Sequence, residues 1–428
     1  MEMLDKGDDP FYVLRQAERV RRLLADCQTE PACAEQLAAH TDEIWRLFEG
    51  REREGVLGRK GPDKFVAEDP VGAGGIDTPL RIYVDTSRNP SLSMQRVYEC
   101  IAPHLRQLGM RFTTEPMGAD LQWDPFGGWT FDPPSADGTI PFVSTFHGAT
   151  GWFVDPVIEY PDLASAVAQQ PYVLRQFFHW QKNMDRVSRF VVPSFFAGRE
   201  LQQSLGMSPD KLTIIHHGVD HQVYRPDGES HPDVGFLHVA AHWRVIKNIE
   251  RTIAAYTASG VADPLTIIVY DWEPDELPLG VRHIRGPLEP KELAKYYRGA
   301  KALVFATLKE TFGLPVAEAM ACGCPVESSY GSALEELYDD AAVLVDPYSM
   351  DSIASGIARA AQSNEAMRLR ANGLIRARSF TWDRAATAYA RLFRNVVAEY
   401  RQDHLKEPWG VNLRRRMARW LSSAERRK

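Results

Sequence analysis

The sequence predicts an α/β protein built from two Rossmann-like domains that face one another across a cleft. Short apolar runs alternate with helix-like stretches from about residue 80 onward. This alternation is the pattern of parallel sheets assembled from right-handed βαβ units. A polar break, DGESHPD at residues 227–233, separates the alternation into two series. The length of 428 residues accommodates two ordinary domains and a small additional element.

The start of the chain differs from the rest. Apolar residues recur at helical spacing between Val13 and Leu24, Pro31 interrupts them, and they resume between Leu37 and Phe48. This pattern predicts a helical hairpin. From about Gly50 to Thr78 the sequence is polar and rich in Gly and Pro, which indicates a linker. We therefore assign residues 1–78 to a helical extension and linker.

The first α/β series is assigned to an N-terminal Rossmann-like acceptor domain, residues 79–226. It opens with LRIYVD at 80–85, a short apolar run suited to a buried parallel strand. The other predicted elements of this series are strands at 141–147, 189–194 and 211–217, and helices at 94–108 and 197–205.

The second series is assigned to a C-terminal Rossmann-like donor domain, residues 227–385, followed by a closing helix and a basic tail over 386–428. Ligands of such sheets bind outside the carboxyl ends of the strands, so the loops there are expected to carry the chemistry. The predicted strands are 234–241, 265–271, 281–286, 302–307, 325–329 and 342–346, and the predicted helices are 249–259, 290–298, 316–322 and 352–362.

Composition excludes several classes of protein. Hydrophobic residues make up 44% and charged residues 25%, the profile of a globular protein. The net charge of -7 argues against nucleic acid as a partner. No apolar run is long enough to cross a membrane, and the first residues do not resemble a secretory signal. Five scattered cysteines fit a reducing compartment, so a cytoplasmic protein is expected.

The most informative stretch is TLKETFGLPVAEAMACGCPV, residues 307–326. A strand ends, a short loop carries Glu310 and Gly313, and Pro315 stands where a helix is predicted to begin. Proline is favoured at the first helical position because its missing N–H would be unpaired there in any case. The N-terminus of this helix would direct free N–H groups and a positive dipole end at the cleft. Such a site suits a diphosphate, and Gly313 allows close approach of the backbone.

Two carboxylates flank this helix start, Glu310 before it and Glu318 within its first turns. Carboxylates accept hydrogen bonds from sugar and ribose hydroxyls, so the two could bracket a nucleotide sugar. For two isolated glutamates the structural interpretation is the commoner one: Glu310 caps the helix and Glu318 lies on a solvated face.

The surrounding residues favour the functional interpretation. ETFGLPVAEAMACGCPV, residues 310–326, resembles the Glu-x7-Glu signature of the retaining glycosyltransferase family 4, whose fold is GT-B. The resemblance implies that Glu310 approaches the donor sugar and that Glu318 contacts the ribose of the nucleotide. The intervening Thr311, Phe312, Gly313 and Leu314 are counted with Glu318 as donor-binding residues. The resemblance extends over about residues 80–400.

Two further sites follow from the same resemblance. Arg244 and Lys247 lie three residues apart at the first strand-to-helix loop of the second series, where family members hold the donor diphosphate with an Arg and a Lys. His147 follows a predicted strand in STFHGATGW, where members often carry a His near the donor sugar. Glu310, His147, Arg244 and Lys247 are thus the predicted catalytic residues.

The chain also departs from the family pattern. DTSRNPSLSMQR, residues 85–96, replaces the usual glycine-rich loop near the diphosphate, and Arg88 or Arg96 could compensate. YDWEPDE at 270–276 replaces the usual loop beside the base, and His217 replaces the usual Asn before Gly218. The nucleotide that this chain prefers therefore cannot be inferred from better-known members of the family.

The predicted function is metal-independent transfer, with retention, of a sugar from a nucleoside diphosphate (UDP or GDP) to an acceptor hydroxyl. No further cofactor is expected, and the acceptor is open. Two alternatives keep the fold: a nucleotide-sugar epimerase or hydrolase, and a catalytically degenerate scaffold. The basic amphipathic tail, 411–428, could contact an anionic membrane surface, pack on the N-terminal domain, or stay unfolded.

Overall fold

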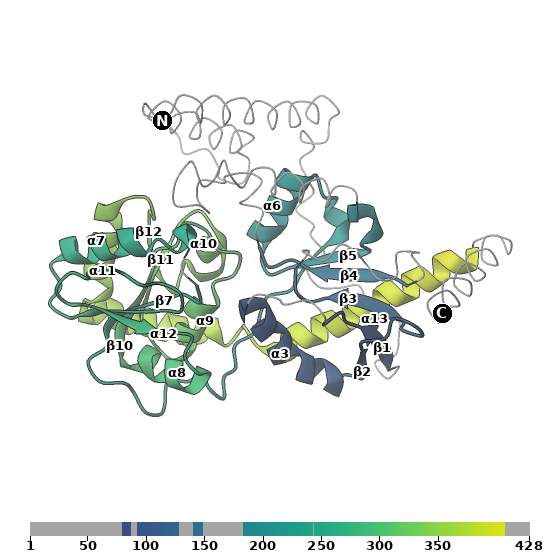
Figure 1. Ribbon diagram of the computed structural model, residues 1–428, viewed down its shortest axis with the longest axis horizontal. Coiled ribbons are helices and arrows are strands. Elements are labelled where there is room, and N and C mark those ends of the chain that lie inside the picture. The colour runs from purple at the N-terminus through teal and green to yellow at the C-terminus, as the bar shows by residue number, and fades with distance from the viewer. Residues whose placement is uncertain (1–78, 87–91, 128–139, 149–182, 243, 407–428) are drawn as a thin grey trace, which may run out of the picture.

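A computed structural model describes residues 79–86, 92–127, 140–148, 183–242 and 244–406. These residues form two α/β lobes (Figure 1), as the sequence predicts. The predicted N-terminal extension, the tail at 411–428 and Arg88 lie outside the described residues. In the part that is described, no helix is long and apolar enough to cross a membrane.

The N-terminal lobe contains a six-stranded sheet in the order β2-β1-β3-β4-β5-β6. All of its pairings are parallel. Two of its strands, β2 and β3, were not predicted from the sequence. All four residues of β3 are buried, and its sequence, LQWD, alternates apolar and polar residues over only four positions, which is a weak strand signal. The strands are β1 Leu80–Tyr83, β2 Met110–Thr113, β3 Leu121–Asp124, β4 Phe142–Thr145, β5 Arg189–Val192 and β6 Leu212–Ile214.

The described residues of this part of the chain include the helices α3 (Leu92–Gln107) after β1 and α6 (Phe195–Leu205) after β5. Ser194 begins α6 by accepting a hydrogen bond from the N–H of Ala197, and Gly206 ends it in the left-handed conformation. Two 3-10 turns, η2 (Met184–Arg186) and η3 (Pro209–Lys211), flank β5 and β6.

The C-terminal lobe repeats this design with a second all-parallel sheet, in the order β12-β11-β10-β7-β8-β9. Its six strands confirm the six predicted for the second series. They are β7 Gly235–Val239, β8 Leu265–Val269, β9 Val281–Arg285, β10 Ala300–Phe305, β11 Val326–Ser329 and β12 Val343–Val345.

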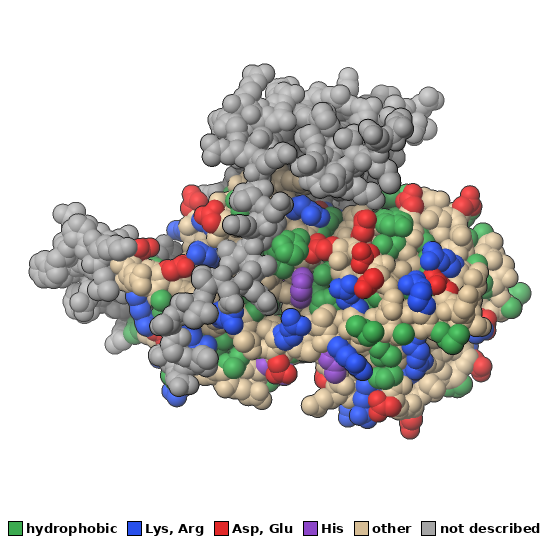
Figure 2. Space-filling view, turned by 180° about the vertical axis from the view of Figure 1, so that it is seen from behind, with side chains coloured by type: hydrophobic (Ala, Val, Ile, Leu, Met, Phe, Trp, Pro, Cys, Tyr) green, Lys and Arg blue, Asp and Glu red, His purple; other side chains and the backbone are tan. Residues whose placement is uncertain are grey.

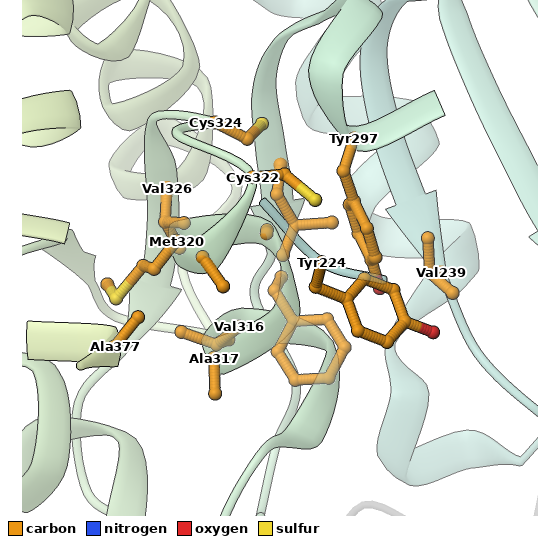
Figure 3. Close-up of a cluster of buried hydrophobic side chains, with 14 of the residues drawn as sticks. Tyr224, Val239, Tyr297, Val316, Ala317, Met320, Cys322, Cys324, Val326 and Ala377 are labelled. Atoms are coloured by element: carbon orange, nitrogen blue, oxygen red, sulfur yellow. The ribbon is translucent and has the colours of Figure 1, made fainter. Parts of the chain in front are cut away.

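The helices of the C-terminal lobe cover both faces of its sheet. One buried cluster, drawn in Figure 3, joins α8 and α9 to the sheet and includes Tyr224, Tyr297, Val316 and Met320. Of the helices, α10 and α12 were not predicted from the sequence. They are η4 Val245–Lys247, α7 Ile249–Ser259, α8 Pro290–Gly299, α9 Leu314–Ala321, α10 Ala333–Tyr338, α11 Met350–Ala360 and α12 Ser363–Ala377.

The chain crosses between the lobes twice, and the two crossings touch. Val219 on the first crossing pairs with Thr381 on the second. Gly218 has no room for a side chain, because a Cβ there would lie 2.2 Å from the backbone N of Trp382. The last helix, α13 (Trp382–Lys406), then runs back along the N-terminal lobe and packs on α3 (Figure 1). The C-terminal segment thus closes the N-terminal core.

Candidate functional site

The loop between β10 and α9 turns sharply at Gly313. This residue has φ 79°, and a Cβ placed on it would lie 2.4 Å from Leu334 Cδ2. Glycine is therefore required both by the left-handed backbone and by the packing of α10. The sequence suggested that Pro315 is the first residue of the helix. In the structure α9 begins at Leu314, so Pro315 is its second residue. Proline is tolerated at either position because neither N–H has an intrahelical partner.

Glu310 and Lys247 meet at this loop. Lys247 Nζ lies 2.5 Å from Glu310 Oε1, and both side chains are mostly buried, with exposed fractions of 21% and 15%. Lys247 ends the turn η4, and Asn248 after it adopts φ 58° and donates to the carbonyl oxygens of Ala306 and Pro347. These bonds tie the loop after β7 to the loops after β10 and β12. A cation and a carboxylate are thus held together at the carboxyl edge of the sheet.

Arg244 begins the same turn. Its carbonyl oxygen accepts a hydrogen bond from the N–H of Lys247, 2.8 Å away. Next to it, His242 Nδ1 lies 3.0 Å from Asp271 Oδ2, and the His242 ring meets Tyr270 edge to face. The loop after β8, which departs from the family pattern, therefore packs against the loop that carries Arg244 and Lys247.

His147 follows β4 in the N-terminal lobe and reaches the same region. Its Nε2 lies 2.7 Å from the carbonyl oxygen of Pro125. Because a carbonyl only accepts, Nε2 carries the proton and Nδ1 has a lone pair. Burial lowers the pKa of His147 below its usual value, so the ring is neutral at neutral pH. Thr311 Oγ1 donates to the carbonyl oxygen of His147 at 2.6 Å, which fixes the N-terminal lobe to the 310–313 loop.

Glu318 is buried, with 4% of its surface exposed. Arg96 Nη2 lies 2.8 Å from its Oε1, and the Tyr297 hydroxyl donates to its Oε2 at 3.2 Å. Burial raises the pKa of Glu318, while Arg96 opposes that rise. The sequence suggested Arg96 as a substitute for a glycine-rich phosphate loop; in the structure it is paired with a carboxylate of the other lobe.

Phe312 and Leu314 take part in packing. The Phe312 ring is buried between the rings of His217 and Phe380. Leu314 is partly buried and touches the cores of both lobes. Their contact with a donor therefore stays a prediction.

Two further polar contacts join the lobes beside this loop, and sequence reasoning missed both. Lys309 forms an ion pair with Glu200 of α6. The carboxylate of Glu336, on α10, accepts hydrogen bonds from the N–H groups of Phe195 and Phe196 at the start of α6, at 2.8 and 2.7 Å. A carboxylate at a helix N-terminus is stabilised by the helix dipole. No local signal marks these residues, because each partner lies more than a hundred positions away.

The border between the lobes is therefore rich in ionisable groups. Figure 2 shows Lys, Arg and His side chains on both sides of this border, with a notch at the lower edge of the view. Among the residues described, no group of His, Cys, Asp and Glu side chains is arranged to hold a metal ion. The arrangement can bind an anion through Lys247, Arg244 and the start of α9, and polyhydroxylated groups through carboxylates and His147.

Family models match one segment in each lobe. Residues 281–375 match the model described as glycosyl transferases group 1. Residues 124–223 match the model described as glycosyltransferase family 4. These matches confirm the resemblance to family 4.

Two curated relatives are named mannosyltransferases. The O-antigen chain mannosyltransferase B of Escherichia coli is 33% identical over 155 residues, 33% of this chain and 41% of the relative. The MMP alpha-(1->4)-mannosyltransferase of Mycolicibacterium hassiacum is 26% identical over 291 residues, 60% of this chain and 66% of the relative. The chain thus spans less than two thirds of the length of either relative.

Solved structures share the fold. Sucrose-phosphate synthase from Thermosynechococcus elongatus superposes with a TM-score of 0.55 at 20% identity, covering 66% of this chain and 75% of that one. Anabaena HepE, solved in complex with UDP and glucose, gives 0.54 at 13% identity, covering 76% of this chain and 100% of that one. The two parallel-sheet lobes therefore have the GT-B architecture that the sequence predicts.

Proposed function

We propose that this chain, which carries segments of glycosyltransferase family 4 and of the group 1 glycosyl transferases, transfers a sugar from a nucleoside diphosphate to an acceptor hydroxyl. The observation that carries the proposal is the Lys247–Glu310 pair in front of the α9 N-terminus. A cation for a phosphate and a carboxylate for sugar hydroxyls stand together there, at the edge of the sheet where ligands bind.

The diphosphate would be the leaving group. Lys247 and Arg244 would bind its oxygens, and the N-terminus of α9 would add the positive end of a helix dipole. Negative charge grows on the leaving oxygen as the glycosidic bond breaks, so preorganised positive groups stabilise the transition state. These groups can supply the role that a divalent cation has in other transferases, and we propose a metal-independent reaction.

The sugar would lie between Glu310 and His147. Glu310 can accept hydrogen bonds from two sugar hydroxyls once Lys247 turns toward the diphosphate. His147 can accept one through Nδ1, because its Nε2–H is used by Pro125. Glu318 would accept from the ribose hydroxyls, as the family resemblance implies.

We propose that the reaction proceeds with retention. The acceptor hydroxyl would attack the anomeric carbon on the face from which the diphosphate leaves, the bond from that carbon to the phosphate oxygen would break, and the departing oxygen would take the acceptor's proton. Closure of the two lobes over the donor would exclude water. The named mannosyltransferases among the relatives make mannose the first sugar to test, and HepE, solved with UDP and glucose, makes UDP a candidate nucleotide beside GDP.

A binding panel tests this proposal. Calorimetry with UDP, GDP, ADP and their common sugar conjugates should identify one nucleotide that binds the wild-type protein and is lost or weakened in Lys247→Ala. Lys301→Ala is the matched control, because Lys301 also pairs with a carboxylate but lies at the start of β10. Failure of the whole panel would contradict the proposal and favour a scaffold. Release of free sugar without any acceptor would instead favour a hydrolase.

A further inference from the structure

Arg96 is the one N-terminal-lobe residue that the described part of the chain shows in an ion pair with the Glu-x7-Glu motif. It stands on α3 of the N-terminal lobe, whereas Glu318 stands on α9 of the C-terminal lobe. The guanidinium lies 2.8 Å from Glu318 Oε1 and also donates to the hydroxyl of Tyr224, on the segment that joins the lobes. The pair therefore exists only while the lobes are docked as they are here.

The two oxygens of Glu318 keep accepting capacity. Arg96 uses one lone pair of Oε1, and Tyr297 uses one of Oε2. A carboxylate offers about four accepting positions. Glu318 is thus held in place on two sides and can still accept hydrogen bonds from a diol that enters when the lobes part and close again.

We propose that Arg96 is a positioning residue of the donor site, which orients Glu318 and keeps it charged so that it can accept hydrogen bonds from the ribose. This inference rests on the proposed function, since it assigns a partner to the carboxylate that would hold the donor. It adds a consequence: a residue of the acceptor lobe completes the donor site, so the site is assembled by docking of the lobes.

The physical reason is the burial of Glu318. A carboxylate without water or a counter-ion becomes protonated, and a neutral acid accepts hydrogen bonds more weakly than a carboxylate. Burial raises the pKa of Glu318, and the charge of Arg96 is the main influence that lowers it. Without Arg96, Glu318 would become neutral at a higher pH.

Among the titratable groups around the Arg96–Glu318 pair, Glu318 is the one whose charge is expected to change between acidic and neutral pH. Arg96 stays charged, and the neighbouring phenols and thiols stay neutral because burial raises their pKa values, that of Cys322 to about 12. The titratable groups facing Glu318 are Arg96 and Cys100 on α3, Tyr224 on the linking segment, Tyr297 on α8, Cys322 at the end of α9 and Tyr338 on α10.

The test is the pH dependence of donor binding in the full-length protein. UDP-glucose and GDP-mannose serve as probes, because their esterified diphosphates do not titrate near neutral pH. Arg96→Met should bind about tenfold more weakly than wild type at about pH 5.5 and regain much of that loss at about pH 8.5. Arg96→Lys should retain most of the wild-type profile. Adding Glu318→Gln to Arg96→Met should remove the difference between the two pH values, because glutamine does not titrate.

Three results would overturn the role of Arg96. These are a wild-type profile in Arg96→Met, an equal loss at every pH, and tighter binding, which would mean that Arg96 blocks Glu318. Absence of probe binding by the wild type contradicts the proposed function itself and with it this role. Even then, the melting temperature of Arg96→Met tests whether Arg96 keeps Glu318 charged. It should fall with rising pH relative to the Arg96→Met/Glu318→Gln double variant, because a carboxyl whose folded pKa is raised loses stability as pH rises.

Discussion

Lys247 Nζ lies 2.5 Å from Glu310 Oε1, so the cation expected to hold the diphosphate and the carboxylate expected to hold the sugar form an ion pair with one another. Both side chains are mostly buried, so separating them leaves two buried charges that need new partners. A sugar nucleotide supplies both at once, since its diphosphate can take Lys247 and its hydroxyls can take Glu310. Binding of the whole donor is therefore favoured over binding of either fragment.

The two members of this pair should have different effects on donor binding and turnover. Lys247→Ala should lower affinity for the nucleoside diphosphate about tenfold to a hundredfold, because a charged hydrogen bond to phosphate is lost. Glu310→Ala should leave that affinity within about threefold and lower kcat by about a hundredfold or more, because the sugar loses its orientation. Calorimetry and steady-state assays of nucleotide release measure the two quantities. Retained turnover in Glu310→Ala would remove its assigned role.

His147 should act as a neutral imidazole. Burial lowers its pKa, so activity should not fall at the usual histidine pKa of about 6.5. We expect a kcat that stays constant from about pH 8 to about pH 6 in wild type, and a kcat lower by about tenfold to a hundredfold in His147→Ala. An acid limb near pH 6.5 that disappears in His147→Ala would contradict the neutral-ring assignment.

Glu327 should make the fold less stable at neutral pH. Its carboxyl is fully buried in β11, none of its oxygens has a hydrogen-bond partner, and its Cγ lies 3.1 Å from where a Cβ on Gly356 would stand. Burial raises its pKa well above the usual value. The free energy of unfolding should therefore be highest below the unfolded pKa of about 4.3 and decline as pH rises toward the folded pKa.

Replacing this carboxyl tests the assignment. Glu327→Met, which has a similar volume, should raise the free energy of unfolding at pH 7 by about 1–3 kcal/mol and abolish that part of the pH dependence. Urea denaturation at several pH values measures both. Glu365→Gln is a control of opposite sign, because Arg368 and Arg359 lower the pKa of Glu365 to about 2, so its contribution is lost as pH falls. A less stable Glu327→Met protein would indicate a partner for this carboxyl.

Gly218 should tolerate no side chain. A Cβ there would stand 2.2 Å from the backbone N of Trp382 and 2.6 Å from the carbonyl carbon of Thr381, where the two crossings of the chain meet. Gly218→Ala should cost about 3 kcal/mol or more, because backbone rather than a side-chain tip has to move. Gly260→Ala is the control: its φ of 69° carries strain, but nothing lies within 4 Å, so it should cost about 1 kcal/mol. Thermal denaturation compares the two, and equal costs would show that the crossing can shift.

Local sequence patterns were enough to predict most of the fold. Runs such as LTIIVYD, residues 265–271, are apolar for longer than a surface strand allows, and they form buried strands of a parallel sheet. The strand β3, LQWD, was missed because an alternation of apolar and polar residues over only four positions is a weak strand signal. Helix α12 was missed because only a minority of its residues are buried, which leaves a weak apolar face.

The candidate site, too, has a part that the sequence predicts and a part that only the structure reveals. The sequence by itself determined the Glu-x7-Glu segment with its loop and, separately, the basic pair Arg244 and Lys247, because the members of each motif lie within a few positions of one another. Only the tertiary structure decided that Arg96 pairs with Glu318 and that Glu336 holds the start of α6. Such partners are brought together by the packing of two lobes, and a contact of that kind leaves no periodicity or spacing in the chain, because its energy depends on where the lobes meet and not on which residues are neighbours in sequence.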